Sequence, residues 1–438
     1  MSVSTQRRNQ GRERIAYRFF AVSSPLAALL FCVTGWLRGT AARADALAVA
    51  DCVQLALARA PSARAARLDA DAAAARVRAA RAAYAPRLLA RGEYGRSAGF
   101  DEAVTNGGST AAVVTVETTL LDGGLRDAQL AAVRARLRSA NALEQQRRAD
   151  ITFAVRSAYF AAVAARAEAD IQRDSLRTLD AYGALLQRQE QLGLVPYNDV
   201  LRAQLAVETA RAAARAAAAE LDAAIGELST LTGTELNAST LVEPGVMLLA
   251  PVTDALIDAS PVMSDGRAAV EAALRDADAV RSEWRTRVTL TADGGALGVE
   301  PGPTFRDNAG GQFLLGVSVP LFDGGATRAR IAAAVAVAHS AAASLEQSRQ
   351  TLTVALGRTR VDAQRAQADL IAWQRAVPRA AENFQLMRAR YLGGGNVRLL
   401  EVLDALAQHV DAGLNVPRAS LAYRLAVATA AHIVGEAP

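Results

Sequence analysis

Two periodicities alternate along this chain and predict its elements in order. From Ala46 to Ala85 apolar residues recur at helical spacing, and Pro61 interrupts them once, which predicts a helix, a break and a second helix. After Pro86 the period becomes two, as in a strand with one apolar face. The residues of that face are Leu88, Ala90, Gly92 and Tyr94.

A second alternating run follows a glycine- and serine-containing loop near residues 97–110. Its apolar face holds Val114, Val116 and Leu120, and its polar face holds Thr115, Glu117 and Thr119. From Leu125 to Leu192 there is no proline and only one glycine, which predicts one helix of roughly 68 residues and about 100 Å. A helix of that length suits a rod or the wall of a tube better than a globular domain.

A turn containing Gly193, Leu194 and Val195 ends this helix and leads into a second one from Tyr197 to Leu231, so a long helical hairpin is expected. Residues 234–259 are expected to form an irregular linker.

The same plan then repeats, which is the strongest signal in the sequence. The offset between equivalent positions stays between 200 and 202. The equivalent pairs are Pro61 and Pro261, Tyr84 and Trp284, Asp122 and Asp323, Gly193 and Gly395, Asp199 and Glu401, and Gly233 and Gly435.

The second half has its own strand pair, at residues 288–292 and 313–319, and its own long helix, Ala326 to Leu392. Pro378 in that helix and Pro417 in the returning helix are expected to kink or break them. We therefore divide the chain into a leader, residues 1–44, and two repeats, residues 45–244 and 245–438.

The second alternating run of each half ends in an Asp-Gly-Gly turn that opens a long helix. The glycines permit a tight backbone turn, and the aspartate can accept hydrogen bonds from the first free N–H groups of the helix. These strand-to-helix elbows are Asp122, Gly123 and Gly124, and Asp323, Gly324 and Gly325.

The first 44 residues have the order of a secretory signal peptide: five arginines, an apolar stretch and an Ala-Arg-Ala site ending at Ala44. A retained membrane anchor and a twin-arginine signal are weaker alternatives. The leader holds seven arginines and one glutamate, so its removal lowers the formal net charge from +5 to about −1. The basic charge therefore gives no support for nucleic-acid binding. Cys32 would leave with the leader, although a lipid anchor on it is an alternative, and Cys52 would remain alone.

Four short strands with one apolar face each match membrane strands in length and alternation. A small soluble sheet covered by helices is the alternative. Four strands cannot close a barrel, and an open edge in lipid leaves backbone groups unpaired. If the strands span a membrane, the chain must oligomerise, and three copies would give twelve strands around a channel.

The chain carries the duplicated elbows, the Gly193-Leu194-Val195 turn followed by Asp199-Val200, and Tyr391 followed by Glu401-Val402-Leu403-Asp404-Ala405. Together these features resemble the TolC-like outer membrane channel family. The resemblance covers nearly the whole mature chain. It implies a homotrimer with a twelve-stranded β-barrel in outer membrane lipid and a helical tube in the periplasm of a Gram-negative bacterium. It also implies a passive duct for efflux or type I secretion, fed through a periplasmic adaptor by an inner-membrane pump or secretion ATPase.

The resemblance also implies roles for individual residues. The turns at Gly193, Leu194 and Val195 and at Gly394 and Gly395 would dock the adaptor. Glu401 and Asp404 would form an acidic ring around the periplasmic mouth, although a solvated helix face is the alternative. Asn198, Asp199, Tyr391 and Arg398 would hold the closed mouth, but an extra residue in the second turn puts Arg398 one place out of register.

Enzymatic chemistry has no support in the sequence. The three histidines, His339, His409 and His432, are far apart, and no nucleophile elbow, phosphate loop or Cys-x-x-Cys is present. We therefore expect no cofactor and no metal. A soluble periplasmic coiled-coil scaffold is the second hypothesis, and the two strand pairs argue against it. Drug efflux and protein secretion cannot be separated at this stage.

Overall fold

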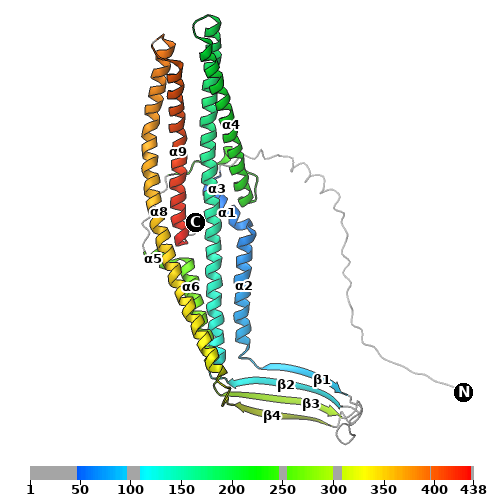
Figure 1. Ribbon diagram of the computed structural model, residues 1–438. Coiled ribbons are helices and arrows are strands. Elements are labelled where there is room, and N and C mark those ends of the chain that lie inside the picture. Colours follow the sequence, from blue (N-terminus) through cyan, green and yellow to red (C-terminus); the bar gives the residue numbers. More distant parts are fainter. Residues whose placement is uncertain (1–46, 96–108, 246–253, 299–307, 395, 436–438) are drawn as a thin grey trace, which may run out of the picture. The chain divides into compact units, whose positions relative to one another are not determined.

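The computed structural model describes residues 47–95, 109–245, 254–298, 308–394 and 396–435, and the predicted leader lies outside them. The first half contains two short helices, two strands and a long helical hairpin (Figure 1). These elements are α1 (Val49–Arg59), α2 (Pro61–Ala82), β1 (Arg87–Gly95), β2 (Ser109–Leu121), α3 (Leu125–Gln191) and α4 (Tyr197–Thr232).

The second half repeats this order. Its elements are η1 (Ala238–Thr240), α5 (Asp254–Ala259), α6 (Pro261–Ser282), β3 (Arg287–Gly298), β4 (Ala309–Ser318), α8 (Ala326–Leu392) and α9 (Leu399–Val434). The matching helices have equal lengths: α2 and α6 have 22 residues, α3 and α8 have 67, and α4 and α9 have 36. The internal repeat and both long hairpins are therefore confirmed.

Two predictions from the sequence were wrong in detail. The linker after α4 is not wholly irregular, because it contains η1 and the short helix α5. Of the kink or break expected at the two later prolines, the break is wrong, because α8 continues through Pro378 and α9 through Pro417; the kink stays a prediction. Pro61 and Pro261 instead occupy the first turns of α2 and α6, where the missing N–H costs no helical hydrogen bond.

The four strands form one antiparallel sheet in the order β1-β2-β3-β4. Its register sorts the side chains by polarity, since directly opposed residues share a face. One row of opposed residues is apolar, Leu88, Val116, Ala292 and Phe313, and the next row on the other face is Leu89, Thr115, Asp293 and Gln312. Thr115 Oγ1 and Gln312 Nε2 both donate to the Asp293 carboxylate, at 2.7 and 3.0 Å.

The end of β2 departs from simple alternation. The register shifts between Thr119 and Leu121, so that Leu121 lies opposite Val288. The extra residue at this irregularity is Leu120, which the alternating pattern had placed on the apolar face. The shift stands directly before the first elbow and ends the strand there.

Helix packing forms the core of the described chain. The hairpin of α3 and α4 lies beside the hairpin of α8 and α9, with α3 against α9, and α2 and α6 both contact α3 (Figure 1). The largest cluster packs Tyr159 and Phe160 of α3 against Cys52 and Val53 of α1 and Leu228 of α4. Within the described residues, no helix has the length and apolar character needed to cross a membrane.

Candidate functional site

Both elbows have the backbone geometry that their sequences predict. The two glycines of each turn have left-handed φ angles, 65° and 88° for Gly123 and Gly124, and 66° and 89° for Gly324 and Gly325. An L side chain is strained in this region, so glycine is the residue that suits both positions.

The aspartate of each elbow caps the long helix that follows. Asp122 accepts hydrogen bonds from the backbone N–H of Gly124 and of Arg126, both at 3.1 Å, and from Arg126 Nε at 2.6 Å. Asp323 accepts from the N–H of Gly325 at 2.9 Å and from that of Thr327 at 2.6 Å. Burial raises the pKa of Asp122, but the hydrogen bonds from Arg126 and Gly124 outweigh it and leave this pKa below its usual value.

The first elbow is covered by the second repeat. Arg285 Nη1 donates to the Gly123 carbonyl at 2.8 Å, and a Cβ on Gly123 would lie 2.3 Å from the Arg285 Cβ. The Arg126 guanidinium lies 5.0 Å from the centre of the Tyr84 ring, and the Tyr84 hydroxyl donates to Asp127. Burial and this hydrogen bond raise the pKa of Tyr84 to about 12.

The second elbow is open in the described chain. A Cβ on Gly324 or Gly325 would meet nothing within 4 Å. A cavity of about 710 Å³ lies over this elbow, and Trp284 and the exposed Phe322 are on its border. The two elbows therefore share their backbone but differ in what covers them.

The turn at the end of the first hairpin projects apolar side chains. Gly193 has φ 72°, and its N–H donates to the Glu190 carbonyl at 2.8 Å. Leu192, Leu194 and Tyr197 are exposed around it, and Val195 is half-buried. These contacts close the hairpin and leave its apolar end uncovered within the chain.

The turn of the second hairpin is one residue longer. Gly394 has φ 73°, the conformation of Gly193, so the structural counterpart of Gly193 is Gly394, which corrects the pairing with Gly395 expected from the repeat offset. The extra residue therefore lies between Gly394 and the start of α9, and Gly395 itself lies outside the described residues.

Below the turns, a small apolar cluster joins the two hairpins. Leu186, Val200, Ala203 and Leu399 are buried in it, and Tyr391 packs against its edge. Sequence reasoning missed this cluster, because the apolar residues of four helices cannot be assigned to one another from period alone. The only available signal is that Val200 and Leu399 both lie in the first turn or two of a returning helix.

The four predicted latch residues lie at these two hairpin ends, and no side-chain hydrogen bond joins any two of them among the described residues. The Tyr391 hydroxyl is buried and lacks a hydrogen-bond partner among the described residues. Burial, and then the nearby charge of Asp199, raise the pKa of Tyr391. Asn198 and Arg398 are exposed at the starts of α4 and α9.

The acidic pair occupies one exposed side at the start of α9. Glu401 and Asp404 are exposed, whereas Val402 and Ala405 between and beside them are buried. The Asp404 carboxylate accepts a hydrogen bond from Gln408 Nε2 at 2.8 Å, one turn further on. The spacing of three residues thus brings both carboxylates to one solvent-facing surface.

Metal binding has no support where the structure describes the chain. There, no three histidine, cysteine, aspartate or glutamate side chains gather as a metal site requires. His432 stacks on Phe153 with ring centres 5.0 Å apart, and His409 stacks on Phe384 at 6.2 Å. Both histidines therefore belong to helix packing.

Comparison with known proteins decides the family. The sequence model of the outer membrane efflux protein family matches residues 52–234 and 252–436, one segment in each repeat. The chain belongs to the outer membrane efflux protein family. It is accordingly an outer membrane channel that extends into the periplasm, and its task is passive passage, not catalysis.

One curated relative in this family is Protein CyaE of Bordetella pertussis. It is 29% identical over 342 residues, which cover 74% of this chain and 71% of the relative.

Solved structures of outer membrane proteins share the fold. A membrane protein from Pseudomonas aeruginosa superposes with a TM-score of 0.80 at 23% identity, covering 88% of this chain and 93% of that one. The MtrE outer membrane channel of Neisseria gonorrhoeae, solved in its open state, superposes with a TM-score of 0.78 at 19% identity, covering 90% and 93%. At these identities the likeness concerns the fold of the outer membrane efflux proteins.

Proposed function

We propose that three copies of this chain form a trimeric outer membrane duct with a twelve-stranded barrel and a periplasmic helical barrel. The observation that carries the proposal is the four-stranded sheet. Within the described residues, β1 and β4 each pair on one side only. One face of the sheet is apolar and exposed, and an unpaired edge in lipid costs several kcal/mol per backbone group.

The internal repeat supplies the missing strand partner. Val116 of β2 pairs with Ala292 of β3 inside the chain. Val317 of β4 is the repeat counterpart of Val116, and Gly92 of β1 is that of Ala292. The same pairing between two copies therefore sets Val317 opposite Gly92 of the next copy. This register keeps the apolar rows on one face across the boundary, since Val317 and Gly92 both belong to the apolar face. Eight strands from two copies would be filled by side chains, whereas twelve can enclose a channel.

A cysteine pair tests this register. Arg91 and Ser318 are the polar-face neighbours in the same pairing, so Arg91→Cys with Ser318→Cys should form an intermolecular disulfide. The expected product is a covalent trimer on a non-reducing gel. The control pair, Arg91→Cys with Val317→Cys, places the two thiols on opposite faces. Equal cross-linking of both pairs, or a covalent dimer as the end product, would refute the proposed assembly.

Around the axis of such a trimer, Glu401 and Asp404 would contribute six carboxylates to the periplasmic mouth. A ring of this kind favours cations and repels anions. Single-channel recordings in planar bilayers should therefore show cation selectivity, and replacing both residues with alanine should reduce it. Unchanged selectivity in the double variant would remove the ring assignment.

The hairpin ends are proposed as the docking surface for a periplasmic adaptor, which would connect the duct to an inner-membrane pump or secretion ATPase. The exposed apolar side chains at Leu192, Leu194 and Tyr197 support this, because no other part of the described residues covers this patch at the end of the hairpin. We propose that contacts of Asn198, Asp199, Tyr391 and Arg398 hold the mouth closed, and that docking exchanges them for contacts with the adaptor.

Two transport roles fit the same duct, namely drug efflux and type I secretion of proteins. A deletion strain distinguishes them by sensitivity to antibiotics and detergents on one side and by release of large proteins on the other. Normal behaviour in every assay would contradict an export role. The leader at residues 1–44 and the repeat boundaries at residues 45–244 and 245–438 remain predictions. N-terminal sequencing of the mature protein tests the leader.

A further inference from the structure

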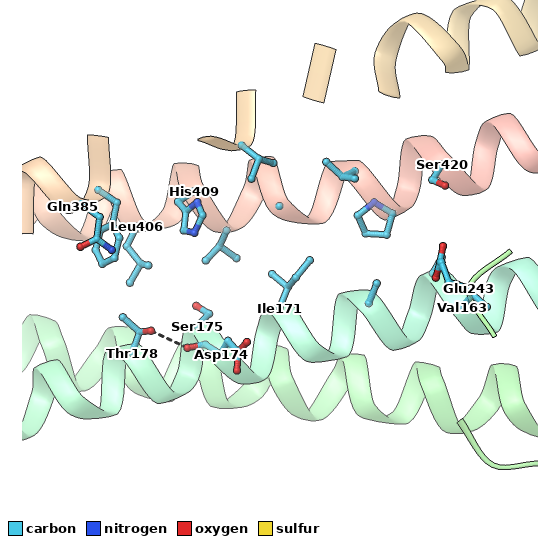
Figure 2. A pocket seen from close by; sticks show the side chains of 18 of the residues that line it. Val163, Ile171, Asp174, Ser175, Thr178, Glu243, Gln385, Leu406, His409 and Ser420 are labelled. Carbon is cyan, nitrogen blue, oxygen red and sulfur yellow. Dashed lines mark hydrogen bonds between the residues drawn. The ribbon is translucent and has the colours of Figure 1, made fainter. Parts of the chain in front are cut away.

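A cavity of about 640 Å³ lies between α3 and the hairpin of α8 and α9. Figure 2 shows it in the space between the two long helices, with Ile171 and Ser175 of α3 facing Leu406 and His409 of α9. The cavity has the volume of a site for a drug-sized molecule. Its lining is mainly apolar, and two acidic and two basic side chains also border it, namely Asp174, Glu243, Arg388 and Arg424. All of its walls belong to one chain.

Small residues create this space. Gly413 of α9 faces Ile171, and a Cβ there would be 3.7 Å from the Ile171 Cγ2 atom. Ala164 and Ala167 stand on the α3 side. The two helices are held at this separation by packing and ion pairs, so the space between them stays unfilled.

Two contacts join the helices along the cavity. Towards the hairpin ends, Phe384 and Leu406 are buried against Leu179 in a cluster that joins both hairpins. Within the span of the cavity, the Arg418 guanidinium binds both oxygens of Glu168, at 3.0 to 3.3 Å. Both contacts hold α9 beside α3 along this stretch.

The α9 wall offers two hydrogen-bonding groups to the cavity. His409 makes no hydrogen bond there, and its Nδ1 atom is buried. The Gly413 carbonyl loses its helical donor, because the residue four positions on is Pro417, which has no N–H. His409, Gly413 and Pro417 succeed one another at four-residue spacing and all line the cavity.

We propose that this cavity binds a neutral, largely apolar molecule that carries a hydroxyl or N–H donor. The apolar body fills the space between α3 and α9, and the donor bonds to the Gly413 carbonyl, beside the His409 imidazole. The ligand donor takes the place of the helical N–H that this carbonyl lacks, which gives the site its chemical preference. Every group named here lies in one chain, so the proposed ligand needs no residue of a second copy or of an adaptor.

The test uses the full mature protein in lipid nanodiscs, with 2-naphthol as the probe and 2-methoxynaphthalene as its matched analogue without a donor. Equilibrium dialysis against empty nanodiscs corrects for partitioning into lipid. The expected result is saturable binding of one 2-naphthol per chain, with about fivefold lower affinity for the methoxy analogue.

Three substitutions locate the site. Gly413→Leu should abolish saturable binding by filling the cavity. If this variant fails to assemble, Ala167→Leu fills the cavity from the α3 side and should have the same effect. Ala422→Leu, on the exposed face of α9 that does not line the cavity, is the matched control and should bind normally. Pro417→Ala restores the N–H donor to the Gly413 carbonyl, so it should weaken 2-naphthol about fivefold and leave the methoxy analogue unchanged.

Several results would overturn the proposal. They are the lack of saturable binding above the nanodisc blank, undiminished binding in a properly assembled Gly413→Leu or Ala167→Leu variant, or equal affinity for the two probes.

Discussion

The long helices α3 and α8 have the same length and place in their repeats, yet they are buried very differently. Phe153 of α3 stacks on His432 of α9, and Phe160 lies beneath the Arg424 guanidinium at 6.0 Å. Their counterparts on α8, one repeat later, are Val354 and Val361, which are 72% and 63% exposed. The same face is therefore covered in the first repeat and bare in the second.

The difference extends along both helices. Of 67 residues each, α3 buries 19 and α8 buries 7. The reason is that α3 lies between α2 and α6 and also contacts α9, whereas α8 contacts α6, α9 and the short α5 among the described residues. Some residues of α9 cover α3. Their counterparts one repeat earlier lie on α4 and are exposed, and Ala219 and Gly226 are two of them. The comparison supports the proposed trimer, in which the first repeat of another copy would cover the second repeat of this one.

The largest expected effect comes from a charge on the bare face. Val361→Glu should reduce the amount of assembled trimer at least tenfold, because the trimer would bury an unpaired carboxylate at each boundary between copies. The measurement is the fraction of heat-modifiable trimer in outer membrane extracts.

Ile371→Glu is the control for this substitution. Its counterpart on α3 is Asp170, which is exposed even in the covered repeat, so a carboxylate should be tolerated there. If both variants assemble normally, the bare face of α8 is not a contact between copies.

An intermediate effect should separate the two elbows. Gly123→Ala forces a side chain into left-handed backbone, at about 1–2 kcal/mol, and also into the Arg285 Cβ, which adds a further cost of about 1–3 kcal/mol. Gly324→Ala has nearly the same φ and no neighbour within 4 Å, so only the backbone cost applies.

Thermal unfolding of the two variants measures this difference. Gly123→Ala should lower the melting temperature more than Gly324→Ala. Equal losses would show that the next copy covers the second elbow as closely as Arg285 covers the first.

The smallest expected effect concerns acid stability. The pKa of Asp122 is lower in the folded chain than its ordinary value of 3.8, so its contribution to stability is present above about pH 4. That contribution is lost as the pH falls through the folded pKa, because the unfolded chain then binds the proton more readily. Asp122→Asn should therefore flatten the stability profile below about pH 4.

The matching variant at the second elbow is Asp323→Asn. At this elbow the uncharged Thr327 stands where the first elbow has Arg126. Asp323→Asn should therefore flatten the stability profile less than Asp122→Asn does. Melting curves from pH 3 to 6 provide the measurement. A steeper profile in Asp122→Asn than in the unmodified protein would contradict the assignment.

Much of the fold could be predicted from the sequence, because its signals are local. Unbroken helical period from Leu125 onward predicts α3, and Asp-Gly-Gly predicts each elbow with its capping hydrogen bonds. The α5 helix was missed because a short helix beside a proline and several alanines has little periodicity of its own. The prolines were overrated as breaks, since the packing of a long hairpin outweighs one lost hydrogen bond.

The candidate site was less accessible from the sequence. The residues of the hairpin ends, Gly193 and Gly394 among them, follow from turn chemistry and from a family resemblance. The cluster around Leu186 and Leu399 and the cavity beside Gly413 and Pro417 depend on which helices meet, and helical period carries no information about partners.

The sequence by itself determined the order and length of the elements, their duplication, and the alternation that separates the two faces of the strands. Local propensities and a constant repeat offset suffice for these. Only the tertiary structure decided that Phe160 is covered while Val361 is bare, and that the register shifts at Leu121. Both outcomes depend on contacts between residues far apart in the chain, and their free energies come from packing surfaces that no local stretch of sequence contains.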